Sequence, residues 1–289
     1  MTFRTRFAPS PTGLLHLGHA YSAMLTHDMA ISQSGELVLR IEDTDTGRCK
    51  SEFETAIYED LNWLGLNWPK PVMRQSERLV AYDLALQKLI EAGYCYPCSC
   101  SRRDIREAIS APQEGAAPAT PDGPLYPGTC RHRTMAERTE TDAIRLNMEK
   151  ALKDRPDIAK AHFTETGSIH GAPKGEIHNL TGEILLEEIG DIVLARRDIA
   201  APSYHLAVVV DDAAQGITHV IRGQDLFAST KIHRVLQILL NFPAPIYHHH
   251  RLIRDEDRKR LAKRDDARAI RTYRESGATA QDIRRMVGL

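Results

Sequence analysis

Apolar residues along the first hundred positions alternate between short runs and longer segments with helical spacing. Residues 3–7 form a short apolar run that predicts a strand, and prolines and a glycine follow it. Residues 14–25 have the periodicity of a helix. A second strand is predicted at 38–41, and amphipathic helices are predicted at 51–64 and 76–92. This alternation of strands and helices favours a parallel α/β sheet.

The pattern changes after residue 95. Residues 95–130 are rich in Cys, Pro, Gly and Ala, and within them 111–128 has the composition of a flexible surface loop. Short strands are predicted further along, at 143–148, 162–165 and 189–194. We interpret this middle part as an insertion into the α/β domain.

The α/β pattern resumes at 204–212. Its uninterrupted apolar run Leu206–Val210 predicts a buried parallel strand. A similar strand is predicted at 217–221, and a helix at 231–240. The expected domains are therefore a catalytic domain in two halves (1–95 and 195–245), an inserted subdomain (96–194) and a helical C-terminal segment (246–289).

Composition limits the classes of protein. The chain has 289 residues, 42% hydrophobic and 27% charged, as in globular proteins that are soluble. No apolar stretch is long enough to span a bilayer and the N-terminus does not have the pattern of a signal peptide, so we expect a cytoplasmic protein. The formal net charge is −1, but residues 251–289 hold twelve Lys or Arg against seven Asp or Glu. That basic segment can steer an RNA backbone, although alternating charges also simply solvate a helix.

The segment His16-Leu17-Gly18-His19 stands where the first predicted helix begins. A helix N-terminus offers unpaired N–H groups and a positive dipole, which suit the phosphates of a nucleotide. Gly18 has no Cβ, so a ribose or an adenine can approach the backbone there. His16 and His19 share one helical face and can both donate to an α-phosphate. The alternative is a chance match in an apolar helix with two structural histidines.

A second charged segment, Lys259-Arg260-Leu261-Ala262-Lys263-Arg264-Asp265, lies near the end of the chain. Together the two segments resemble the ATP signatures of class I aminoacyl-tRNA synthetases. The run RFAPSPTG at 6–13 and the run LRIEDTD at 39–45 resemble the glutamyl branch of that class. The resemblance implies a Rossmann-like α/β catalytic domain with an inserted zinc-containing α+β subdomain that binds the acceptor end, and a short C-terminal stem-contact segment.

In the lysine segment, Lys263 has the place of the second lysine of the family's KMSKS loop, where it would neutralise the triphosphate. Arg260 replaces the first lysine and Ala262 replaces the serine. The resemblance thus implies catalytic roles for His16, His19 and Lys263, and an ATP site made of these three with Gly18. The segment Tyr247–His250 resembles the family's YxHHPLI segment, which implies a turn near the nucleotide rather than a metal site.

The resemblance also implies a site for glutamate. The segment GITHVIRGQD at 216–225 and the segment PSYHLAVVVDD at 202–212 match the glutamyl enzymes. An arginine fork suits the side-chain carboxylate, Glu42 would face the ammonium group, and Tyr204 would wall the pocket. Buried Arg–Glu pairs can also be purely structural. Glutamine is disfavoured as substrate, because glutaminyl enzymes have PPEPNG where this chain has APSPTG. The implied glutamate site consists of Arg6, Phe7, Ala8, Pro9, Ser10, Glu42, Tyr204 and Arg222.

Cys98 and Cys100 bring two soft ligands together, and Cys130 supplies a third after a long loop. Zinc prefers four ligands in a tetrahedron, and the residues leave the fourth open among Tyr126, Cys95 and His132. The family's small members use CxC…YxxxC, which implies Tyr126, although the interval between Cys100 and Tyr126 is longer than usual. The zinc would be structural and clamp the insertion. Buried cysteines without a metal are the alternative.

Lys263 stands close to the last residue of the sequence, with no space for the helical anticodon-binding domain of the larger enzymes. The resemblance is therefore to the truncated paralogues of the glutamyl branch. It implies tRNA-independent activation of L-glutamate by ATP, with Mg²⁺, and transfer to the queuosine base at the wobble position of tRNA(Asp). We expect a monomer without membrane contact. The alternatives are a minimal enzyme that charges a tRNA 3′ end, and a non-catalytic tRNA-binding paralogue.

Overall fold

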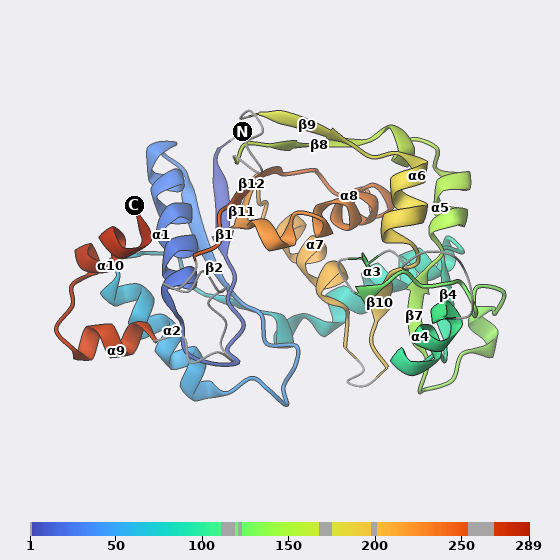
Figure 1. The fold of residues 1–289 in the computed structure, drawn as a ribbon, viewed down its shortest axis with the longest axis horizontal. Coiled ribbons are helices and arrows are strands. Elements are labelled where there is room, and N and C mark those ends of the chain that lie inside the picture. Colours follow the sequence, from blue (N-terminus) through green and yellow to red (C-terminus); the bar gives the residue numbers. More distant parts are fainter. Residues whose placement is uncertain (1, 111–118, 121–122, 168–174, 198–200, 254–268) are drawn as a thin grey trace.

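The computed structural model describes residues 2–110, 119–120, 123–167, 175–197, 201–253 and 269–289 (Figure 1). The strands are β1 (Arg4–Phe7), β2 (Glu36–Ile41), β3 (Met73–Arg74), β4 (Cys95–Cys98), β5 (Ala119–Thr120), β6 (Gly123–Pro124), β7 (Ala143–Leu146), β8 (His162–Glu165), β9 (Glu176–Asn179), β10 (Val193–Ala195), β11 (His219–Gly223) and β12 (Ile246–His250). The helices are α1 (Leu17–Ser32), α2 (Ser51–Trp63), α3 (Leu79–Glu91), α4 (Arg102–Ser110), α5 (Met148–Asp154), α6 (Gly182–Ile184), α7 (Tyr204–Ala214), α8 (Ser229–Leu239), α9 (Ile270–Glu275) and α10 (Ala280–Val287).

Two parallel sheets lie side by side at the centre of the molecule. One has the strand order β1-β2-β3, and the other has the order β11-β12-β8-β9, in which only β9 is antiparallel. The N–H of Thr218 donates to the carbonyl of Arg4 at 2.9 Å, which joins β1 to the segment that leads into β11. The chain therefore winds away from β1 in one direction and returns beside it through β11. In such α/β sheets the junction is where ligands bind, at the carboxyl ends of the strands.

Two hydrophobic cores cover these sheets. The first packs α1 and α2 on β1 and β2, and the C-terminal helices α9 and α10 bury Ile270 and Ile283 in the same core. The second is larger and contains α3, α7 and α8 together with β7 and β10. Arg284 of α10 pairs with Asp28 of α1, so the C-terminal helix lies against α1 at one side of the molecule (Figure 1).

A third, antiparallel sheet has the order β10-β7-β4 and lies at the opposite side of the molecule from α10 (Figure 1). Its strands come from the predicted insertion. Two further strands of that insertion, β8 and β9, extend the parallel sheet, since Glu165 of β8 stands in register with Tyr247 of β12. Most of the surface loop predicted at 111–128 lies outside the described residues, and β5 pairs with β6 in the part that is described.

The strand predicted at 204–212 is wrong, because these residues form the helix α7. Ser203 caps this helix by accepting the N–H of Leu206, at 3.3 Å. All five residues of the apolar run Leu206–Val210 are buried, because α7 lies between α3 and α8. A run that is apolar on every side has no period, so it cannot distinguish a buried helix from a buried strand.

Other elements differ less from the sequence predictions. The helix predicted at 76–92 is split into a 3₁₀ turn at Gln75–Arg78 and α3. Only the end of the strand predicted at 189–194 is extended, since residues 185–189 form a π-helical turn. The expected turn at 247–250 is the strand β12. Among the described helices, none combines the length and the apolar character that crossing a membrane requires.

Candidate active site and cysteine cluster

A cavity of about 560 Å³ opens at the junction of the two parallel sheets. The carboxyl ends of β1, β2, β11 and β12 and the first turn of α1 line it. The cavity brings together all the predicted glutamate and ATP residues except one, Lys263, which lies outside the described residues. The predicted residues that line it are Arg6, Phe7, Ala8, Pro9, Ser10, His16, Gly18, His19, Glu42, Tyr204 and Arg222.

The two histidines at the start of α1 cap the helix that they open. The Nδ1 atom of His16 accepts the N–H of Gly18 at 3.1 Å, and the Nδ1 atom of His19 accepts the N–H of His16 at 3.2 Å. A neutral imidazole that accepts at Nδ1 carries its proton on Nε2. The caps therefore fix both rings as Nε2–H donors, 3.8 Å apart between ring centroids.

Gly18 leaves room for this cap. A Cβ atom at position 18 would lie 3.0 Å from Cε1 of His16, closer than ordinary van der Waals contact. The absence of a side chain thus lets the His16 ring fold over the helix start. This is a steric role within the protein, in addition to the close approach of a nucleotide that the sequence suggests.

One wall of the cavity is an alternating chain of charges. The Nε atom of Arg6 donates to Asp212 at 3.1 Å, and the fully buried Arg40 donates to Asp212 at 2.7 Å and to Glu42 at 3.1 Å. Burial raises the pKa of the Glu42 carboxyl, against the opposing effects of Arg40 and Arg6. The two cations and the two carboxylates balance each other.

Arg40 and Asp212 were not among the predicted site residues. Both stand inside segments that resemble the glutamyl enzymes, LRIEDTD and PSYHLAVVVDD. Each is a charged residue in or next to an apolar run. Such a residue is expected to be buried, and a buried charge requires a partner, so this pattern could have marked both as members of an ion pair. Because residues 211–212 were predicted to end a strand, the pairing of Asp212 with Arg6 and Arg40 could not be inferred.

Arg222 on β11 is held differently from Arg6. It is 5% exposed, yet among the described residues no carboxylate lies within ion-pair distance of its guanidinium. Its partners are uncharged: Nη2 donates to Thr230 Oγ1 at 2.7 Å and to the Leu226 carbonyl at 3.1 Å, and Nη1 donates to Tyr204 Oη at 3.5 Å. A buried cation without a counter-charge is an attractive site for an anion.

Two buried histidines complete the surroundings of Arg222. Its Nε atom donates to His249 Nε2 at 3.1 Å, and Nη1 lies 3.2 Å from His233 Nδ1. Burial, reinforced by the charge of Arg222, lowers the pKa of His233 well below its usual value. Burial also lowers the pKa of His249 to about 4, against the opposing effect of the hydrogen bond that its ring donates to Glu165. Both rings are therefore neutral acceptors near pH 7 and leave the positive charge on Arg222.

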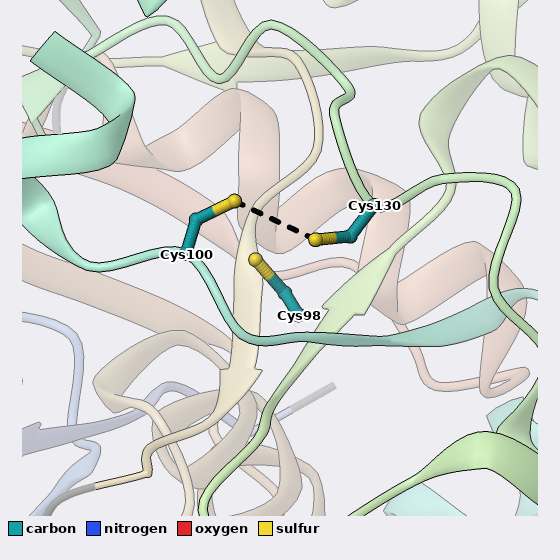
Figure 2. Close-up of side chains that lie close together, drawn as sticks. All are labelled: Cys98, Cys100 and Cys130. Atoms are coloured by element: carbon teal, nitrogen blue, oxygen red, sulfur yellow. Dashed lines mark hydrogen bonds between the residues drawn. The ribbon is translucent and has the colours of Figure 1, made fainter. Parts of the chain in front are cut away.

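The cysteine cluster lies in the insertion, away from the cavity. The sulfur atoms of Cys98, Cys100 and Cys130 all lie within 4.8 Å of one another (Figure 2). They come from the end of β4, the turn before α4 and the segment after β6. This donor set can hold a metal ion. Cys95 is buried in the larger core and His132 is exposed, and neither belongs to this cluster.

The hydroxyl of Tyr126 joins the three sulfur atoms. It lies 3.4 Å from Cys98 Sγ and 3.5 Å from Cys100 Sγ, and it accepts the N–H of Cys130 at 2.9 Å. The guanidinium of Arg145 stacks on the Tyr126 ring, with its central carbon 3.9 Å from the ring centroid. Of the three alternatives left open by the sequence, Tyr126 is therefore the one that adjoins the cysteines.

The junction of parallel sheets, the capped helix start and the buried Arg222 without a counter-charge are features that suit an α/β enzyme. The family model described as tRNA synthetases class I (E and Q), catalytic domain, matches residues 2–289, and this chain belongs to that family. Class I synthetases use ATP, so the cavity is that of an ATP-dependent enzyme.

Two relatives are informative. The glutamyl-Q tRNA(Asp) synthetase of Rhodobacter capsulatus is 52% identical over 288 residues, which cover 99% of each chain. The glutamate–tRNA ligase of Aquifex aeolicus is 39% identical over 281 residues, and this chain spans only 54% of its length. Among solved structures, the glutamate-tRNA synthetase of Elizabethkingia anophelis superimposes with a TM-score of 0.69 at 28% identity, over 96% of this chain and 54% of that one.

Proposed function

We propose that this protein activates L-glutamate with ATP, without tRNA, and transfers it to the queuosine base at the wobble position of tRNA(Asp). The observation that carries the amino-acid assignment is the uncompensated Arg222 on the cavity wall. Glutamate brings one net negative charge, which Arg222 balances. The acceptor assignment rests on the 52% identity, across the whole of both chains, to the glutamyl-Q tRNA(Asp) synthetase of R. capsulatus.

The side-chain carboxylate of glutamate would bind at the edge of Arg222 that faces the cavity. The 3.5 Å contact between Nη1 and Tyr204 Oη is the longest that the guanidinium makes, and Tyr204 is 38% exposed. An incoming carboxylate can replace this weak contact with a charge-assisted one and accept from the Tyr204 hydroxyl as well. The ammonium group would lie at Glu42, where its charge would offset the burial of that carboxylate.

The α-carboxylate then remains to attack the α-phosphorus of ATP. The bond from the carboxylate oxygen to phosphorus forms while pyrophosphate leaves. The Nε2–H groups of His16 and His19, together with the start of α1, would stabilise the negative charge that builds on the phosphate oxygens. Lys263 would bind the leaving pyrophosphate, and Mg²⁺ accompanies the nucleotide. In the second step a queuosine hydroxyl attacks the carbonyl carbon, an ester forms and AMP leaves.

The cysteine cluster would bind one structural zinc ion through Cys98, Cys100, Cys130 and Tyr126. A tetrahedral zinc with Zn–S bonds of about 2.3 Å and a Zn–O bond of about 2.1 Å has ligand edges of ~3.8 Å and ~3.6 Å. The Cys100–Cys130 sulfur separation is 3.5 Å, and the Tyr126 hydroxyl lies 3.4 and 3.5 Å from two sulfur atoms. These separations support the fit. The ion would clamp the proposed insertion 96–194, with no open position for catalysis.

The activation step is tested by glutamate-dependent exchange of pyrophosphate into ATP in the absence of tRNA. We expect exchange with L-glutamate, and much less with L-glutamine, which lacks the charge that Arg222 would bind. Equal exchange with glutamine would contradict the role of Arg222. No exchange with either amino acid, in folded protein, would favour the non-catalytic alternative.

The 3′-end alternative is favoured by one observation, the 39% identity to a glutamate–tRNA ligase. In that case the same adenylate would be consumed by the terminal ribose of tRNA(Glu). The position of the label on the tRNA separates the two acceptors, because removal of the 3′-terminal adenosine abolishes charging of the 3′ end and leaves the wobble base intact.

A further inference from the structure

The buried carboxylate of Glu165 lies behind Arg222, one residue removed from it. Its Oε2 atom is hydrogen-bonded to Nδ1 of His249, whose Nε2 accepts from Arg222 Nε at 3.1 Å. Glu165 and His249 are each 1% exposed. Among the described residues that line the cavity, neither is present, whereas Arg222 is. The side-chain hydrogen bonds from Glu165 therefore reach the cavity through His249 and Arg222.

The donors around His249 define its tautomer. A guanidinium can only donate, so Nε2 of His249 must be an acceptor, and the hydroxyl of Thr230 also lies 3.3 Å from it. The ring proton therefore stands on Nδ1 and is donated to Glu165. An imidazolium would place an Nε2–H against the Nε–H of Arg222, donor against donor.

Two backbone donors fix the orientation of the Glu165 carboxylate. Its Oε1 atom accepts the N–H of His249 at 2.9 Å and the N–H of Gly167 at 2.6 Å. A Cβ atom at Gly167 would lie 2.1 Å from the His249 carbonyl, so no larger residue fits there without a shift of the backbone. These two backbone donors prescribe which oxygen faces the ring.

We propose that Glu165 is a positioning residue for recognition of the substrate carboxylate: by holding His249 as the Nδ1–H tautomer, it orients Arg222 without neutralising it. A carboxylate in direct contact would orient the guanidinium equally well, but would compete with the substrate for its charge. The neutral ring between them separates the two functions. This inference rests on the proposed function, since it takes the Arg222 ligand to be the glutamate side chain.

The isosteric variant Glu165→Gln isolates this role. The two backbone N–H groups require the amide oxygen at the Oε1 position, so the amide NH₂ faces Nδ1 of His249. The ring proton must then move to Nε2, where it opposes Arg222 Nε–H. Since the side-chain carboxylate is bound equally before and during reaction, we expect a KM for glutamate raised about tenfold or more with kcat nearly unchanged.

The matched control is Glu176→Gln. Glu176 stands directly opposite Glu165 in the β8–β9 pair, is partly exposed and lies near His178. It loses the same charge on the same sheet, outside the Arg222 network. A KM at least about threefold above that of the control supports the proposal, and a KM within about threefold overturns it and leaves Glu165 structural.

A second readout does not depend on activity. Nitrogen-15 NMR of His249 in the wild-type protein should show a protonated Nδ1 and an unprotonated Nε2, and Glu165→Gln should exchange them. An Nε2–H ring or an imidazolium in the wild type at pH 7 would overturn the proposal, even if the variant failed to fold. If the wild type has this tautomer but shows no glutamate-dependent pyrophosphate exchange, the proposed function fails. The orientation of Arg222 by Glu165 through His249 is then still supported.

Discussion

The cavity and the cysteine cluster hold their polar groups in opposite ways. In the cavity wall, Arg6, Arg40, Glu42 and Asp212 form hydrogen bonds with one another, and neutral side chains hold Arg222. In the cluster, three thiols and a phenol converge: the Tyr126 hydroxyl lies 3.4 and 3.5 Å from two sulfur atoms, and Cys100 Sγ lies 3.5 Å from Cys130 Sγ. The charged residues of the cavity thus pair with one another, whereas the cluster presents donor atoms that can hold a metal ion. We infer that adenylation and metal binding are separable.

The largest effect is expected from Lys263→Ala, which removes the cation that would face the leaving pyrophosphate. Loss of one such group costs about 10²–10³ in rate, so exchange should fall close to background. The fold should be unchanged, as judged by thermal unfolding. Lys259→Ala, which lies in the same segment but outside the motif, is the control. Exchange at the wild-type rate in Lys263→Ala would remove Lys263 from the site.

Arg222→Lys tests the proposed anion site on the cavity wall. A lysine retains the charge but cannot form the fork, and it leaves Thr230 and His249 without their donor. We expect kcat/KM for glutamate to fall about 10²-fold or more, mostly through KM. Arg234→Lys, on α8 but not lining the cavity, should have little effect. An unchanged KM for glutamate would mean that the side-chain carboxylate binds elsewhere.

The cluster side of the comparison is tested by metal content. The purified protein should carry about one zinc ion per chain, and Cys100→Ser should lose it and unfold at a lower temperature. Because no cluster residue lines the cavity, glutamate-dependent exchange should remain within about threefold of the wild type at a temperature where both are folded. Cys95→Ser, a buried thiol outside the cluster, should retain the metal. Exchange lost in step with zinc would show that the two regions are not separable.

The smallest effect concerns a third arrangement, a buried carboxylate that has an ion pair but, among the described residues, no hydrogen bond. The side chain of Asp60 is fully buried, and neither oxygen has a hydrogen-bond partner among the described residues, although Arg274 lies 3.4 Å away. Burial raises its pKa to about 6, against the opposing charge of Arg274. The folded chain thus binds more protons than the unfolded chain between about pH 4 and pH 6, and this contribution to stability is lost as the pH rises.

Asp60→Asn should therefore gain stability relative to the wild type as the pH increases from 4.5 to 7.5, by at most about 3 kcal/mol at 1.36 kcal/mol per pKa unit. Urea unfolding at the two pH values measures this difference, with the exposed neighbour Glu59→Gln as control. A difference between variant and wild type that does not change with pH would contradict the raised pKa.

Much of the cavity could be predicted from the sequence, because the sequence motifs lie where strands end and helices begin. Pro9 and Pro11 mark the end of β1, and the histidine segment opens α1 as expected. The parallel pairing of β1 with β2 followed from the alternation of strands and helices. The prediction that segments about two hundred residues apart form one site came from the resemblance to the family, since local sequence patterns do not encode distant contacts.

The other features of the fold and the site could not be predicted from the sequence, for physical reasons. The residues of the run Leu206–Val210 are all buried, so their hydrophobicity shows no helical period. Because a strand was predicted there instead of a helix, the partners of Asp212 could not be identified. Glu165 and His249 stand on neighbouring strands, and neither has a sequence neighbour that signals the other. The choice of Tyr126 beside the cysteines depended on how three segments meet in space.

The measurement that tests the central claim most directly follows radiolabelled glutamate, with ATP, onto three tRNAs. These are tRNA(Asp) with queuosine, tRNA(Asp) without it, and tRNA(Glu), each used intact or with its 3′-terminal adenosine removed. We predict label only on the queuosine-containing tRNA(Asp), retained when that adenosine is removed and lost in mild base. Label on intact tRNA(Glu) that is absent once the adenosine is removed would contradict the proposed acceptor.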